Sequence, residues 1–234
     1  ILVVYSAERH ISVESGRHLY EKLASSDNYE VLPVFLTGNQ KQHELYTIPI
    51  NVLLKDNADD IREKILDFHI HPVIEKIIGR CSKLTDRFAN SRNLEAPQRL
   101  SYDELSKRCD VVFIALHGRP GEDGSLQVEL EKVGLPYNGS GPASSQITID
   151  KYRTNELLGK NNFKVAKHYL ANEFDWLADP ALFLNTISEK FTFPFIAKPV
   201  DDGCSSAVKI IRSREELEAY VRLVFRTNKE LEAN

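Results

Sequence analysis

Residues 1–36, ILVVYSAERHISVESGRHLYEKLASSDNYEVLPVFL, hold two apolar runs on either side of a segment with helical periodicity. The first run, residues 1–5, is rich in β-branched side chains, which suits a strand that is buried on both faces. Residues 13–23 have apolar or small side chains at helical spacing, and residues 29–36 predict a second strand. A strand, a helix and a second strand in this order are typical of a parallel sheet. The stretch therefore predicts an N-terminal α/β domain built on a parallel sheet.

The α/β pattern continues only after a polar interval. Residues 50–55 predict another short strand, whereas residues 56–100 are polar, mixed in charge and helical only in places. Ser101 and Glu104 have the spacing of a capping box, which predicts a short helix after Ser101. Residues 111–116, VVFIAL, predict a third buried strand.

The second half of the chain has a different organisation. Ser144 or Ser145 can cap a helix that runs to about Leu158, and residues 163–171 resemble a strand. The remaining predicted elements are a helix at 181–189, two strands at 193–199 and 207–211 that form a hairpin, and a helix at 214–225. A sheet of so few strands needs at least one more to close its face, so this half of the chain is expected to be cut short.

The composition is that of an ordinary globular protein. The chain has 234 residues and a mass of 26.6 kDa, which corresponds to one large domain or two small ones. Its 30 basic and 34 acidic residues leave a net charge of −4, which disfavours a dedicated nucleic-acid-binding protein. The longest apolar runs have strand length, so no membrane span is predicted; a retained signal peptide is excluded, but a cleaved one is not. Three cysteines without a close pair indicate reduced thiols in a cytoplasmic protein.

The chain contains no methionine, not even at its start. We therefore expect that Ile1 follows at least one further residue, and we hypothesise that methionines are omitted from the printed sequence. An intact mass of the expressed protein equal to that of these 234 residues would contradict this hypothesis.

The loop of residues 198–208, KPVDDGCSSAV, lies between two predicted strands and is rich in small residues. Small side chains let backbone N–H groups approach an anion closely, and Lys198 at the mouth of the loop supplies a point charge for a phosphate. The loop does not have the GxxxxGK[ST] pattern of a P-loop. From these residues alone, a polar hairpin loop with a surface lysine is an equally good interpretation.

A second glycine-rich stretch, residues 116–124 (LHGRPGEDG), directly follows a predicted strand. Ligand sites of open α/β sheets lie beyond the carboxyl ends of the strands, so a histidine, three glycines and two acids at this place indicate binding. Glu8 follows the first strand, would open onto the same crevice, and is a candidate cation-binding carboxylate. The alternative is a glycine-rich turn in which Glu122 and Asp123 are solvated.

Three separated parts of the sequence resemble one family. They are SAERHISVESG at residues 6–16, ALHGRPGEDGSLQVELEKVGLPYNGSG at 115–141 together with IDKYRTNELL at 149–158, and FPFIAKPVDDGCSSAV at 193–208. These motifs resemble the D-alanine–D-alanine ligases, which belong to the ATP-grasp superfamily. The order of HGxxGEDGxxQ, PYxGSG and DK is specific, and the similarity covers about residues 1–36 and 110–220.

The resemblance implies an N-terminal α/β domain at residues 1–139, with an insertion at about 56–100, followed by a truncated central ATP-grasp subdomain at 140–234. The C-terminal ATP-grasp lobe, which carries the magnesium ligands in the family, is then expected to be missing. ATP and Mg²⁺ are the implied cofactors, with the metal ligands beyond Asn234. Within the chain no metal site is predicted, because His69 and His71 lack a Cys, Asp or Glu cluster to complete one.

The family pattern also implies roles for individual residues. Lys151 and Lys198 resemble the two lysines that hold the phosphates of ATP. Glu8 resembles the catalytic carboxylate that receives the ammonium group of the first D-alanine, and His117 lines the same pocket.

Gly203, Cys204, Ser205 and Ser206 resemble the glycine-rich lid over the ATP phosphates. The family usually reads GSSxG where this chain reads GCSSA, so either Cys204 or Ser205 occupies the serine position. The pattern leaves open which of the two, if either, joins Glu8 in positioning the substrate, and Ser205 is the catalytic candidate.

The resemblance implies an ATP-dependent carbon–nitrogen ligase that joins two D-alanines through an acyl phosphate for peptidoglycan precursor synthesis. ATP and D-alanine would be its partners, without nucleic acid or membrane, in a cytoplasmic protein that could form a homodimer. One alternative keeps the fold but changes the acceptor to D-lactate, D-serine or another amino acid. The other is a non-catalytic nucleotide-binding module of a longer protein, which downstream magnesium ligands would argue against.

Overall fold

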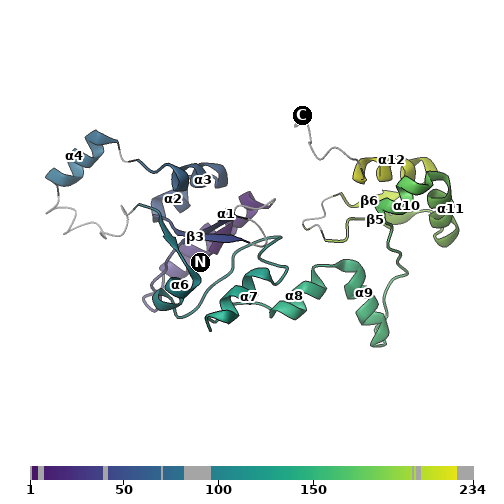
Figure 1. Ribbon diagram of the computed structural model, residues 1–234, viewed down its shortest axis with the longest axis horizontal. Helices are drawn as coiled ribbons and strands as arrows, with labels where there is room; N and C mark the ends of the chain where they lie inside the picture. Colours follow the sequence, from purple (N-terminus) through teal and green to yellow (C-terminus); the bar gives the residue numbers. More distant parts are fainter. Residues whose placement is uncertain are drawn as a thin grey trace. The chain divides into compact units, whose positions relative to one another are not determined.

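The computed structural model divides into two compact units, residues 1–147 (unit 1) and residues 148–234 (unit 2) (Figure 1). It describes residues 2–4, 8–38, 42–69, 71–81, 96–201, 203 and 207–225. Within these described ranges, unit 1 has two clusters of buried hydrophobic residues and unit 2 has one. Each unit therefore has hydrophobic packing of its own.

Unit 1 is built on a mixed sheet with the strand order β1-β2-β3-β4. β1 (Leu2–Val4) pairs parallel with β2 (Val34–Gly38), and α1 (Arg9–Ala24) connects them, which confirms the predicted strand–helix–strand unit. β3 (His43–Thr47) pairs antiparallel with β2 on one side and with β4 (Gln98–Leu100) on the other. Among the described strands, the expected parallel arrangement is therefore limited to β1 and β2.

The sequence pattern predicts neither β3 nor β4. β3 reads HELYT and buries only Leu45 completely, so its strand character depends on pairing with β2 and not on an apolar run. Residues 39–42 alone separate β2 from β3, and so short a connection requires an antiparallel return. β4 lies inside the stretch expected to be an insertion and places Leu100 opposite Leu45.

Two helices of unit 1 begin at clear caps. α3 (Ala58–Leu66) follows Asn57, whose side chain accepts hydrogen bonds from two backbone amides of the first turn. α6 (Tyr102–Arg108) has the predicted capping box between Ser101 and Glu104. Besides α1, the remaining helices described up to the end of this unit are α2 (Ile50–Lys55), α4 (Pro72–Arg80), α7 (Ser125–Lys132) and α8 (Pro142–Thr148).

Residues 50–55 form α2, so the strand predicted there is wrong. Val52 and Leu53 are both buried in one cluster with side chains of α1 and α3, whereas neighbouring residues of a strand would point to opposite faces. Both amides donate to the carbonyl oxygen of Pro49, as in a first helical turn. Periodicity cannot distinguish a short buried strand from a short buried helix, and here the tertiary packing decides.

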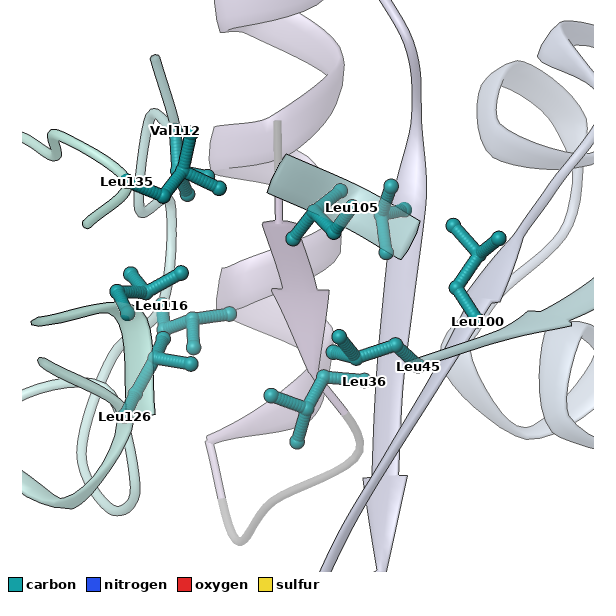
Figure 2. Packing of buried hydrophobic residues seen from close by; sticks show 10 residues of the cluster. Leu36, Leu45, Leu100, Leu105, Val112, Leu116, Leu126 and Leu135 are labelled. Carbon is teal, nitrogen blue, oxygen red and sulfur yellow. The ribbon is translucent and has the colours of Figure 1, made fainter. Parts of the chain in front are cut away.

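Both faces of β2 are buried. Val34 and Leu36 point into one cluster and Phe35, between them, points into the other. The first cluster joins the sheet to α6, to α7 and to the segment around Val112 and Leu116 (Figure 2); its members are Val34, Leu36, Leu45, Leu100, Leu105, Val112, Leu116, Leu126, Leu130 and Leu135. The second joins the sheet to α1, α2 and α3 through Val13, Phe35, Ile48, Val52, Leu53, Ala58 and Ile61.

Residues 111–116 are extended but do not form the predicted strand buried on both faces. Val112 makes an isolated parallel bridge with Tyr137, while Val111 and Phe113 are 60 % and 40 % exposed. The amide of Ile114 donates to the side chain of Asn138 and not to a backbone carbonyl. One face of the segment packs in the core and the other is exposed.

Unit 2 combines a two-stranded hairpin with helices. β5 (Phe195–Ala197) and β6 (Lys209–Ile211) pair antiparallel with Ile196 opposite Ile210, which confirms the predicted hairpin. Its helices are α9 (Lys151–Lys160), α10 (Glu173–Ala178), α11 (Pro180–Lys190) and α12 (Arg214–Val224). Their buried cluster consists of Trp176, Phe183, Leu184, Ile187, Ile211, Leu217, Tyr220 and Val221.

Two expectations for this region are wrong. The helix expected to run from Ser144 or Ser145 to Leu158 is two helices, α8 and α9, because Asp150 accepts a hydrogen bond from the amide of Arg153 and starts a new one. Residues 163–171 form no strand, and α10, which is not predicted, follows them. No helix in the part of the chain that the structure describes has the length and hydropathy for crossing a membrane.

Candidate functional site

Glu8 lies between β1 and α1, beyond the carboxyl end of β1. It directly precedes α1, and its side chain does not cap the helix. The carboxylate instead lies beside the backbone of Gly118, where an added Cβ would be 3.5 Å from Glu8 Oε1. Gly118 has a φ of +67°, a conformation that favours glycine, so it presents backbone and no side chain to the carboxylate.

His117 is held against α1 by two serines. Its backbone amide donates to Ser12 Oγ over 3.1 Å, and its Nε2 lies 2.8 Å from Ser15 Oγ. The Glu8 carboxylate lies beside Gly118, and Gly118 directly follows His117. Glu8 and His117 are therefore close together in unit 1. The structure thus brings together the two residues that the family pattern assigns to the pocket of the first substrate.

The acids of the glycine-rich loop fold the loop itself. Glu122 Oε2 accepts a hydrogen bond from the amide of Gly118 over 2.9 Å. Asp123 is 8 % exposed and accepts hydrogen bonds from the amide and the hydroxyl of Ser125. Gln127 Nε2 donates to the carbonyl of Gly121. The alternative of a turn with two solvated acids is therefore wrong for Asp123, which is buried and bonded.

Lys151 and Lys198 line one pocket of unit 2, with a volume of about 680 Å³. Lys151 is the first residue of α9, and both its amide and its ammonium group donate to the carbonyl of Val200, over 3.0 and 3.3 Å. Lys198 directly follows β5 and is exposed. The antiparallel hairpin and the start of α9 therefore bring two lysines that are distant in sequence to the same pocket.

Apolar side chains form much of the wall of this pocket. They come from the segment before β5, from β5 and from α12, and include Phe191, Phe195, Leu217, Tyr220 and Val221. An apolar wall with a few charged groups at one side is the usual make-up of a small-molecule site.

His168 lines the same pocket, and sequence reasoning does not identify it because it lies in a stretch predicted to be a strand. Its Nδ1 lies 2.8 Å from the carbonyl oxygen of Ala166 and its Nε2 lies 2.9 Å from Glu156 Oε1. A carbonyl and a carboxylate both accept, so both bonds form only when each ring nitrogen carries a proton. The Ala166 carbonyl is the main cause of a raised pKa of His168; burial opposes it, and Glu156 adds to it.

Of the predicted lid, the structure describes Gly203, which is half-buried, whereas Cys204, Ser205 and Ser206 lie outside the described residues. Ala207 follows them with a φ of +52°, in the left-handed region that glycine adopts at lower cost. The hydroxyl of Tyr220 donates to the carbonyl of Ala207 over 2.8 Å.

The described residues do not provide a metal centre. Within them, no group of three or more His, Cys, Asp or Glu side chains could hold a metal ion. His69 is exposed and lies 3.2 Å from Asp67, which is a surface pair.

Comparison with known proteins assigns the family. The model described as D-ala D-ala ligase N-terminus matches residues 2–140, and the model described as D-ala D-ala ligase C-terminus matches residues 157–231. The chain belongs to the D-alanine–D-alanine ligase family.

Among relatives in this ligase family, the D-alanine–D-alanine ligase of Chlorobaculum tepidum is 28 % identical over 92 % of this chain and 54 % of its own length. That of Leptospira interrogans is 36 % identical over 53 % of this chain and 35 % of its own length. The chain thus spans about half the length, or less, of these curated relatives.

Solved structures of two ligases share the fold. The D-Ala:D-Ser ligase from Enterococcus faecalis matches with a TM-score of 0.64 and 22 % identity over 96 % of this chain and 58 % of its own. The D-alanine–D-alanine ligase from Helicobacter pylori matches with a TM-score of 0.59 and 22 % identity over 94 % and 60 % of the two chains. At this identity the likeness concerns the mixed α/β fold alone.

Proposed function

We propose that this chain contributes the first-substrate pocket and the phosphate pocket of an ATP-dependent ligase that joins two D-alanines for peptidoglycan precursor synthesis. Family membership supports the proposal. The observation that carries it is the pocket of unit 2, which both Lys151 and Lys198 line. A polyphosphate requires such a concentration of positive charge.

The proposed chemistry makes use of these residue types. A carboxylate is a poor electrophile, so the γ-phosphoryl group of ATP first moves to a carboxylate oxygen of one D-alanine, and ADP leaves. The amine of the second D-alanine then forms the C–N bond, the C–O bond to phosphate breaks, and phosphate and a proton leave. Phosphoryl transfer depends mainly on positioning and charge neutralisation, which Lys151 and Lys198 would supply.

Unit 1 would bind the first D-alanine. In the proposal the carboxylate of Glu8 receives its ammonium group, with His117 in the same pocket and Gly118 leaving space beside the carboxylate. Cys204 or Ser205 would join them from the lid over the ATP phosphates. These roles rest on the family pattern and on the placing of Glu8 and His117.

The proposal extends to the organisation of the enzyme. We propose residues 1–139 as the N-terminal domain, with an insertion at 56–100, and residues 140–234 as part of the central ATP-grasp subdomain. Mg²⁺ is proposed as a cofactor on the family resemblance. A cytoplasmic location and a homodimer rest on the same resemblance, and light scattering of the purified protein tests the homodimer.

The direct test is product formation by the full-length protein. With ATP, Mg²⁺ and D-alanine, we expect release of ADP that depends on D-alanine, and a dipeptide with the mass of D-Ala-D-Ala. D-Serine and D-lactate offered as second substrates identify a different acceptor by product mass. Nucleotide binding without any amino-acid-dependent ADP release would instead support the non-catalytic module.

A further inference from the structure

Ser12 joins the two residues assigned to the first-substrate pocket. Its side chain is completely buried on α1. The hydroxyl donates to the carbonyl of Glu8 over 3.2 Å and accepts from the amide of His117 over 3.1 Å. One hydroxyl therefore bonds both to the residue at the start of α1 and to the residue at the start of the glycine-rich loop, which are 109 positions apart (117 − 8).

Ser15 holds the ring of the same histidine. It lies three residues after Ser12, so both serines are on the same face of α1. Ser15 Oγ lies 2.8 Å from His117 Nε2 and restricts the rotation of the imidazole. Together the two hydroxyls hold both the backbone and the ring of His117.

Simple packing does not explain two hydroxyls at this place. A serine within a helix often bonds to the carbonyl four residues earlier, which accounts for only one of the two bonds of Ser12. Its neighbour Val13 is 1 % exposed and packs in an apolar cluster, so apolar packing against α1 is available nearby. The hydroxyls instead satisfy groups of His117, and a buried amide without its acceptor is costly.

We propose that Ser12 and Ser15 are positioning residues for the first D-alanine, because they hold Glu8 and His117 in a fixed mutual arrangement. The inference rests on the proposed function of that pocket. Ser12 links the backbone of Glu8 to the backbone of His117, and Ser15 fixes the orientation of the His117 imidazole. Neither serine touches the substrate in this proposal; both act through the residues that do.

Kinetics of the full-length protein test the proposal. We expect Ser12→Ala and Ser15→Ala to raise the KM of the first D-alanine by about three- to tenfold, the loss of one hydrogen bond, and to leave the KM of ATP unchanged. Ser15→Thr retains the hydroxyl and should restore most of the loss. Ser25→Ala is the matched control, because Ser25 also donates to a backbone carbonyl, that of Lys22, at the far end of α1.

Nitrogen NMR of the His117 ring gives a readout that does not need turnover. Ser15→Ala should shift the ring nitrogen resonances of His117, and Ser25→Ala should not. Ring resonances that stay unchanged in Ser15→Ala would overturn the proposal. A ring shift without a change in the KM of D-alanine, or with an equal rise in the KM of ATP, would also overturn it. If the unaltered protein makes no dipeptide, the proposed function fails and the positioning role with it, while a ring shift would still establish the Ser15–His117 bond.

Discussion

At the scale of single residues, two lysines provide the positive charge of the proposed ATP pocket. Lys151 is bonded to the Val200 carbonyl, whereas Lys198 is exposed at the end of β5. We expect Lys151→Ala and Lys198→Ala each to weaken ATP binding by about 1–3 kcal/mol, the range for hydrogen bonds to charged groups. Titration calorimetry of the full-length protein measures this loss.

The control for the two lysines is Lys160→Ala. Lys160 ends the same helix α9, is exposed and does not line the pocket. Its replacement should leave ATP affinity unchanged. Equal affinities in all three variants and in the unaltered protein would show that the pocket does not bind the phosphates.

A second prediction at this scale concerns Glu8. Glu8→Gln keeps the shape of the side chain but removes the charge that would bind an ammonium group, so the KM of the first amino acid should rise more than that of ATP. Glu21→Gln, an exposed position later on α1, should change neither value. A variant with impaired ATP kinetics and normal amino-acid kinetics would place Glu8 in a different site.

At the scale of elements, His168 joins the stretch before α10 to α9. Its ring bonds to the Ala166 carbonyl and to Glu156, and it packs edge-on against Tyr152 with the ring centroids 5.4 Å apart. The hydrogen bond to the Ala166 carbonyl is the main cause of a raised pKa of His168 in the folded protein. Burial lowers this pKa, and Glu156 raises it. Protonation of this ring therefore stabilises unit 2.

The sign of the pH dependence follows from the raised pKa of His168. Its contribution is fully present below the ordinary histidine pKa of about 6.5 and is lost as the pH rises through the folded-state value. His168→Gln should therefore reduce the free energy of unfolding of unit 2 more at low pH than at high pH, as measured by urea titration. Glu156→Gln should reduce this pH dependence without removing it, because the Ala166 carbonyl remains. A loss that is the same at all pH values would contradict a protonated His168.

At the scale of the whole molecule, the two units have separate hydrophobic clusters. The cluster of unit 2 contains a tryptophan that can serve as a fluorescence probe. Trp176 is the single tryptophan of the chain, is 6 % exposed and packs edge-on against Phe183 in the cluster of unit 2. Its fluorescence therefore follows the unfolding of that cluster. Mutations on α11 can be tested with it directly.

Leu184 and Leu182 form a matched pair on α11, since they are 4 % and 62 % exposed. Leu184→Ala should destabilise unit 2 by about 2–5 kcal/mol through the cavity it leaves. Leu182→Ala should change stability by no more than about 0.5 kcal/mol, because it removes an exposed side chain. Denaturant titration followed by tryptophan fluorescence compares the two, and equal losses would show that the cluster is not the core of unit 2.

The amino-acid sequence by itself determined the features that depend on neighbouring residues. The strand–helix–strand unit at residues 1–36 follows from apolar periodicity, and the cap of α6 follows from the spacing of Ser101 and Glu104. The β5–β6 hairpin follows from two apolar runs around small residues. The motifs that contain Glu8, His117, Lys151 and Lys198 identified the candidate site before their positions were known. Each of these signals is contained in its own short stretch of the chain.

Only the tertiary structure decided the features that join distant residues. The polar segment HELYT becomes β3 because β2 and β4 pair with it, and residues 50–55 become α2 because Val52 and Leu53 are buried together. The bond between Ser15 and His117 spans 102 positions, and that between Lys151 and Val200 spans 49. The secondary-structure propensity of a short segment cannot predict such partners, because their contacts form only when distant parts of the chain pack together.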